Sequence, residues 1–237
     1  MVSAAPAPAR PAPARPGPAG RAAGDVTVEA APGVWVAWAR TAAVSEHPAD
    51  LADVRGRPRW RRRQSLAARG LLRTLLAEVC PGTEGVALTA DVRGRPALEG
   101  LPALGVSLSH DGPGDTSGAL GGDLVAAAVA PGRRVGVDVQ LPPGPDVPAG
   151  LVRRCLRERA GELSSLPAGR RALEFAWVWT VQEACVKADG TGIAGRPWSL
   201  DIPVRPGTGT LGDLTWIALR HLSVHPVSCA FGDLRAR

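Results

Sequence analysis

The chain has 237 residues, enough to bury a sizeable core as one large or two small domains, and 45% of its residues are apolar. Its formal net charge of +6 favours an anionic partner, such as nucleic acid, a phosphorylated cofactor or an acidic protein. No stretch approaches 18 consecutive apolar residues, so a membrane span is not expected. The four cysteines have no CxxC spacing, which argues against a zinc site or a disulfide framework and for reduced thiols in a cytoplasmic protein.

The first part of the chain predicts a tail, a strand and a helix. Residues 1–24 are mostly Ala, Pro, Gly and Arg, so we expect a disordered tail that lacks the apolar segment of a signal peptide. The folded part is expected to begin near Asp25. Residues 34–39 form an apolar run typical of a strand, and residues 59–79 have the leucine spacing of an amphipathic helix.

Shorter elements follow. Residues 86–89 and 106–109 are predicted short strands, and residues 124–130 and 135–140 are predicted to pair as a hairpin across Pro-Gly-Arg-Arg. The proline-rich segment 142–148 is interpreted as a linker between two halves, 25–141 and 142–237.

The second half repeats the pattern of a long helix with a few strands. The clearest helix in the chain is expected over 172–188, ending at Asp189-Gly190, because glycine adopts the left-handed conformation that closes helices. A further helix is expected over 151–163. The predicted strands, which would form one antiparallel sheet, are 198–204, 214–220 and 227–231. Each half therefore has an α+β pattern.

Lysine usage points to a functional residue. Twenty-seven of the 28 basic residues are Arg, Lys187 is the only Lys, and there is neither Asn nor Tyr. This bias against AT-rich codons indicates a GC-rich, bacterial gene. A lysine that persists under such pressure is expected to do something that arginine cannot, since lysine is a compact point charge and arginine is planar and forked.

Glu183 and Lys187 are four residues apart in the predicted helix and share one face. One interpretation is an exposed ion pair that contributes about 0.3–0.5 kcal/mol. The other is a functional pair, because Phe175, Trp177 and Trp179 precede it and would surround it with packed aromatic rings.

Asp138 and Gln140 lie on one face of the predicted strand Val135–Gln140, opposite its valines. An acid within an apolar strand needs a partner. It either caps a neighbouring loop or binds a metal, and magnesium takes one or two carboxylates with phosphate and water oxygens. Asp138 and Glu183 fit that count.

Two weaker signals complete the set. Ser107-Leu108-Ser109-His110 ends a predicted strand, and a single histidine there is either structural or, beside Gly112 and Gly114, part of a binding site. Gly94-Arg95-Pro96 is a turn that would direct one arginine.

Together these segments resemble one family. Their order is G-R-P, S-x-S-H, G-V-D-x-Q and W-T-x-x-E-x-x-x-K-x-x-G. This order is similar to that of the 4′-phosphopantetheinyl transferase superfamily, in its larger, surfactin-synthetase-associated (Sfp-type) form known from peptide and polyketide synthesis. The resemblance spans about residues 34–231. The basic helix that contains Arg61 and Arg69 also fits.

The resemblance implies an α+β pseudodimer of two similar halves, with the active site in the cleft between them. It implies transfer of 4′-phosphopantetheine from coenzyme A to a serine of an apo acyl or peptidyl carrier protein, which is acidic, with release of adenosine 3′,5′-bisphosphate. The protein would be a monomer that binds neither nucleic acid nor membrane. The acceptor protein and the pathway stay open.

The resemblance also implies residue roles. Asp138 and Glu183 would hold Mg²⁺ against the coenzyme A pyrophosphate, with Glu183 as a general base, and Lys187 would contact the transferring phosphate. Gln140 would be a weak or water-mediated ligand. The residues implied to bind the nucleotide end, including its 3′-phosphate, are Arg95, Ser109 and His110, with Arg61 and Arg69 less directly.

Two positions depart from the family pattern. Many relatives have Glu where this chain has Gln140, and an amide binds Mg²⁺ more weakly than a carboxylate. Asp111 follows His110 where Ser or Thr is common. Because an acid beside a phosphate pocket is unfavourable, we expect Asp111 to point away.

Two alternatives to the transferase remain. The first is a basic nucleic-acid-binding module, supported by the arginines at 59–63 but not by interleaved aromatic residues or a known motif. The second is a catalytically silent homologue that only binds coenzyme A, against which the intact Asp138, Glu183 and Lys187 argue.

Overall fold

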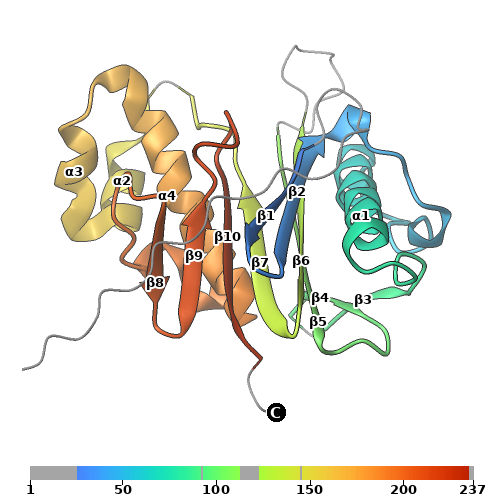
Figure 1. Cartoon of the computed structure of the whole chain (residues 1–237). Helices are drawn as coiled ribbons and strands as arrows, with labels where there is room; N and C mark the ends of the chain where they lie inside the picture. The colour runs from blue at the N-terminus through green and yellow to red at the C-terminus, as the bar shows by residue number, and fades with distance from the viewer. Residues whose placement is uncertain (1–25, 92, 113–122, 145, 235–237) are drawn as a thin grey trace, which may run out of the picture.

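The structure, a computed structural model, describes residues 26–91, 93–112, 123–144 and 146–234. The tail expected over residues 1–24 lies outside the described residues. The described elements form four layers in the order helix, sheet, sheet, helix (Figure 1). Helices and small antiparallel sheets are thus combined as the sequence predicts for an α+β fold.

The first sheet has the strand order β1-β2-β6-β5 and is antiparallel throughout. Its strands are β1 (Val26–Ala31), β2 (Val34–Arg40), β5 (Leu104–Asp111) and β6 (Leu124–Pro131). Helix α1 (Arg59–Val79) covers its outer face with leucines such as Leu72 and Leu75, which are fully buried. A two-stranded ribbon, β3 (Leu88–Ala90) and β4 (Pro96–Leu98), lies beside β5.

The second sheet has the order β7-β10-β9-β8 and is also antiparallel. Its strands are β7 (Arg133–Val139), β8 (Thr208–Leu211), β9 (Leu214–Ala218) and β10 (Val227–Asp233). Helix α4 (Ala168–Asp189) covers the outer face, with α2 (Ala149–Leu156) and α3 (Ala160–Ser164) packed beyond it (Figure 1). The short 3-10 helices are η1 (Thr41–Ala43), η2 (Pro48–Asp50), η3 (Arg157–Arg159), η4 (Gly192–Gly195) and η5 (Pro197–Ser199).

The inner faces of the two sheets enclose a common apolar core of small and β-branched side chains. Val34, Val36 and Ala128 contribute from the first sheet, and Val137 and Cys229 from the second, each with at most 1% of its surface exposed. Burial of these side chains holds the sheets face to face.

Serine hydroxyls join the edge strands β5 and β7. The backbone N–H of Val137 donates to Ser107 Oγ at 3.1 Å, and that of Val139 donates to Ser109 Oγ at 3.4 Å. Both serines point the same way because they are two residues apart in a strand. The S-x-S segment therefore links the two sheets at the point where Asp138 lies.

Two strand predictions are wrong. Residues 124–130 and 135–140 do not form a hairpin, because β6 pairs with β2 and β5 whereas β7 pairs with β10. The chain passes from one sheet to the other at Gly132, which has a left-handed φ of 69°. Residues 198–204 begin in η5 and do not pair as a strand, and the carbonyl of Leu200 accepts instead from Gln182.

The two long helices are confirmed. α1 has the predicted bounds, and α4 ends at Gly190 with a φ of 71°. The four cysteines are free thiols, of which Cys155, Cys185 and Cys229 are buried. None of the described helices is long and apolar enough to cross a membrane.

Candidate active site

Asp138 lies at the centre of a hydrogen-bonded cluster between β5, β7 and α4. Its Oδ1 accepts from Lys187 Nζ at 2.6 Å and from Ser109 Oγ at 2.7 Å. The Asp138 side chain is 8% exposed and that of Lys187 is 26% exposed. Lys187 also donates to the Val137 carbonyl at 3.0 Å. The acid therefore has the partners that a carboxylate in an apolar strand requires.

Gly136 allows α4 to approach β7 closely. A Cβ atom built on Gly136 would lie 2.1 Å from the Ala184 carbonyl oxygen, 2.5 Å from the Ala188 nitrogen and 3.0 Å from Lys187 Cβ. No side chain fits there without displacing the helix. The glycine of the G-V-D segment thus sets the distance at which Lys187 reaches Asp138.

Glu183 lies one helical turn before Lys187 but is not its hydrogen-bonding partner, since Lys187 donates to Asp138. Burial raises the pKa of Glu183, the charge of Asp138 raises it further, and Lys187 opposes both effects. Among the described residues, none donates a hydrogen bond to the Glu183 carboxylate. The Glu183 carboxylate is thus close enough to Asp138 and Lys187 for both charges to act on it.

Asp111 is the last residue of β5, and Gln140 directly follows β7. Gln140 Nε2 donates to Asp111 Oδ2 at 2.8 Å, and the Leu141 N–H donates to the same oxygen at 2.6 Å. Burial raises the pKa of Asp111, and Asp138 and Asp123 add to the increase. Asp111, which we expected to point away from the site, is turned toward Gln140.

His110 lies close to several cations. Burial lowers its pKa to about 4, and the charges of Arg61, Lys187 and Arg57 contribute to the decrease. Arg61 is thereby placed near the site, with its guanidinium also 5.6 Å from the ring of Trp60. The imidazole is neutral at pH 7, in a region where positive charge accumulates.

Arg95 and Lys187 line the same small cavity, of about 140 Å³, with Ser107 and Gly190. The turn that presents Arg95 is closed by Asp91, whose Oδ1 accepts from the Arg95 N–H at 2.9 Å. Arg95 also borders a larger cavity of about 640 Å³ along β4 and β5. A ligand with separated negative charges could contact both cations.

Arg69 is engaged elsewhere. It donates to Asp50 at 3.2 Å and to Asp53 at 2.8 Å, and its side chain is 14% exposed. In this arrangement it braces the segment before α1.

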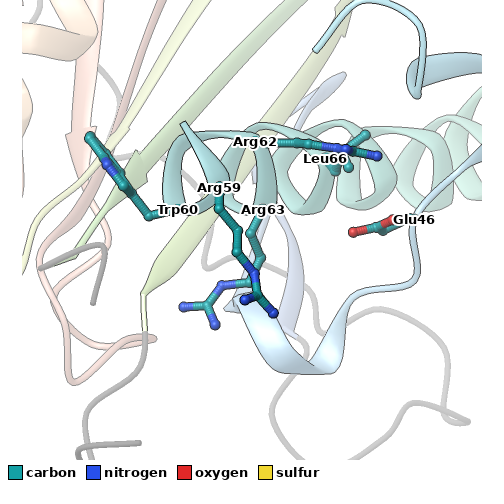
Figure 2. A pocket seen from close by; sticks show the side chains of 6 residues that line it. All are labelled: Glu46, Arg59, Trp60, Arg62, Arg63 and Leu66. Carbon is teal, nitrogen blue, oxygen red and sulfur yellow. The ribbon is translucent and has the colours of Figure 1, made fainter. Parts of the chain in front are cut away.

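A separate basic hollow of about 310 Å³ lies at the start of α1. Figure 2 shows Arg59 and Arg63 side by side, with Glu46 facing the helix from the preceding loop and Trp60 directed away from the other labelled side chains. Arg63 is paired with Asp123 at 3.2 Å, and Trp60 is 42% exposed.

The structure therefore brings together Asp138, Glu183 and Lys187, with Ser109 and Arg95 adjacent. It adds two residues that the sequence left without a role, Ser107 and Asp111. Ser107 could have been found from the alternation of the S-x-S segment. No group of three or more His, Cys, Asp or Glu side chains suited to a metal occurs in the part of the chain that the structure describes.

Comparison with known families gives a match over part of the chain. Residues 134–223 match the model of the 4′-phosphopantetheinyl transferase superfamily, which confirms the resemblance seen in the sequence. The matched segment runs from β7 through α4 into the loop after β9 and contains Asp138, Glu183 and Lys187. The general activity indicated is phosphopantetheine transfer, for which coenzyme A is the donor. No curated protein matches the chain.

Proposed function

We propose that this protein is a Mg²⁺-dependent 4′-phosphopantetheinyl transferase of the larger, Sfp-type form, acting on a serine of an apo acyl or peptidyl carrier protein. The observation that carries the proposal is the convergence of Asp138 on β7 with Glu183 and Lys187 on α4, within the segment that matches the superfamily. An acidic carrier protein also suits a chain with a net charge of +6.

The side chains at the site fit a magnesium ion. Asp138 and Glu183 offer carboxylate oxygens, and Gln140, which follows β7 two residues after Asp138, offers an amide oxygen. Burial and then the charge of Asp138 raise the pKa of Glu183, and a bound cation would offset both effects. Bound there, Mg²⁺ would neutralise the charge that develops on the pyrophosphate oxygens.

Lys187 and Glu183 have distinct roles in the transfer. The carrier serine oxygen forms a bond to the β-phosphorus, and the bond from that phosphorus to the leaving adenosine 3′,5′-bisphosphate breaks. Lys187 uses two of its three N–H groups on Asp138 and Val137, which leaves one for a phosphate oxygen. Glu183 accepts the serine proton, a role that its raised pKa favours.

The remaining cations bind the nucleotide end of coenzyme A. Arg95 reaches it from the cavity it shares with Lys187, and Arg61 and the neutral His110 lie near its 3′-phosphate. Ser109 acts mainly by holding Asp138. Arg69 contributes only if it leaves Asp50 and Asp53.

We further propose that residues 25–141 and 142–237 are the two halves of a pseudodimer, with coenzyme A in the cleft between them. At the level of the sheets the division falls earlier, at Gly132, because β7 pairs with β10. The protein would act as a monomer in the bacterial cytoplasm, in peptide or polyketide synthesis.

The test is the intact mass of an apo acyl carrier protein after incubation with this protein, coenzyme A and Mg²⁺. We expect a gain of one phosphopantetheine, and no gain with Asp138→Ala. An unchanged mass for the parent protein, with coenzyme A still bound, would instead support a silent coenzyme A-binding homologue.

A second candidate, a nucleic-acid-binding module, is favoured only by the basic hollow at Arg59, Arg62 and Arg63 (Figure 2). Its test is the retention of labelled single-stranded or duplex DNA at about 0.15 M salt, where phosphate contacts alone are weak. Glu46 in the hollow and the Arg63–Asp123 ion pair reduce its positive potential.

A further inference from the structure

The side chains of Asp111, at the end of β5, and Gln140, just after β7, are in direct contact. They are 29 residues apart in the chain, yet Gln140 Nε2 lies 2.8 Å from Asp111 Oδ2. The serine links between β5 and β7 bring the two strand ends to this distance.

This contact determines which way the Gln140 carboxamide faces. An ionised carboxylate can only accept hydrogen bonds, so the NH₂ group of Gln140 must be the side that meets Asp111. Leu141 N–H donates to the same Asp111 oxygen at 2.6 Å and anchors that carboxylate from the backbone. Gln140 Oε1 is therefore the atom left for another partner. Because Gln140 follows Asp138 by two residues, its side chain is on the same side of the chain as that of Asp138.

The contact also couples the residue types that positions 111 and 140 can carry. A glutamate at position 140 would set two carboxylates about 2.8 Å apart, losing the hydrogen bond and adding repulsion. A serine at position 111 would remove that conflict, because its hydroxyl can accept from Leu141 N–H and donate to a glutamate. A glutamate at position 140 with a serine at position 111, and the present Gln140 with Asp111, are thus two combinations that each place one acid at this contact.

We propose that Asp111 and Gln140 form a coupled pair, in which Asp111 is a positioning residue that presents Gln140 Oε1 as a neutral oxygen ligand to the metal. The inference rests on the proposed transferase function, since it concerns the metal site of that reaction. It predicts that Gln140→Glu alone destabilises the contact with Asp111. Position 140 can take an acid only if position 111 loses its acid at the same time.

The test is a cycle of four proteins: the parent, Asp111→Ser, Gln140→Glu and the double variant. The melting temperature without metal measures how much the contact between positions 111 and 140 stabilises the fold. Mn²⁺ affinity in the presence of coenzyme A, measured from the electron paramagnetic resonance signal of free Mn²⁺, shows whether position 140 is a metal ligand. Gln140→Glu alone should melt roughly 5 °C below the parent at pH 8, and the double variant should recover most of that loss. The double variant should bind Mn²⁺ about tenfold more tightly than the parent, because a charged oxygen replaces a neutral one.

Asp146→Asn is the matched control, because Asp146 is an exposed acid in the segment that follows Gln140. It should leave the melting temperature and the Mn²⁺ affinity at the parent values. Additive melting effects in the cycle would overturn the coupling, and equal Mn²⁺ affinity in all four proteins would overturn the ligand role. If the parent itself binds no Mn²⁺, the ligand role and the proposed metal site fail together, while the melting cycle still decides whether the pair is coupled.

Discussion

Replacing Lys187 by arginine preserves the charge but not the shape that the site requires. Lys187 Nζ lies 2.6 Å from Asp138 Oδ1 and 3.0 Å from the Val137 carbonyl. The approach of α4 to β7 at Gly136 fixes where the side chain starts. A longer, forked guanidinium would bind the Asp138 carboxylate at two points and move into the space proposed for the phosphate.

The size of the effect follows from these contacts. A displacement of about 1 Å in a reacting group costs on the order of a hundredfold in rate, so Lys187→Arg should lose about 99% of turnover while keeping much of the coenzyme A affinity. Its ion pair with Asp138 survives, so its melting temperature should change little. Lys187→Ala instead leaves an 8% exposed carboxylate without its cation, at a cost of about 3 kcal/mol, or roughly 6–12 °C in melting temperature.

The assay is steady-state transfer to an apo carrier protein, paired with coenzyme A binding and thermal melting. Arg170→Lys is the matched control, since Arg170 lies on the same helix with its side chain 63% exposed. It should behave as the parent does. If Lys187→Arg also matches the parent in turnover, the argument from shape is refuted, and Lys187 contributes charge alone.

Further predictions concern the neighbouring residues. Ser107→Ala and Ser109→Ala should each leave a strand N–H unpaired and destabilise the fold by about 1–3 kcal/mol in denaturant titrations. Of the two, only Ser109→Ala should also slow transfer, because Ser109 donates to Asp138 and Ser107 does not. Equal transfer rates for the two variants would contradict this. Gly136→Ala should lower the melting temperature and the rate together, because α4 must move outward; parent-like melting would show that the helix has room. The pKa of His110 is about 4 in the folded protein against an ordinary 6.5, so the unfolded state binds more protons between these values. Stability should therefore fall by up to about 3 kcal/mol as pH drops from 6.5 to 4, and His110→Gln should remove this part of the slope in urea titrations; an unchanged slope would refute the assignment.

Helices were predictable from the sequence because their signals are local. The leucine spacing of α1 and the glycine that closes α4 each lie within the element they define. The partner of β7 was not predictable, because both β6 and β7 are nearly continuous buried runs. Such a run does not show which sheet it joins, and only the shared core between the sheets decides it.

The sequence indicated which candidate residues would lie together but not how they contact one another. The motif order indicated Asp138, Glu183 and Lys187, yet the side-chain spacing suggested that Lys187 faces Glu183. The structure pairs Lys187 with Asp138, 49 residues away. The contact of Asp111 with Gln140 likewise depends on how β5 meets β7, which no local pattern encodes.

The central claim is that Asp138 and Glu183 hold the metal that transfer requires. The most direct measurement is the rate of carrier-protein loading from coenzyme A as Mg²⁺ is added back to metal-stripped protein, for the parent and for Asp138→Asn. Asparagine keeps the size of the side chain but removes the charge. The account predicts a saturable Mg²⁺ dependence for the parent and no rescue of Asp138→Asn at any Mg²⁺ concentration. Full loading by the stripped parent without Mg²⁺, or by Asp138→Asn at the parent rate, would contradict it.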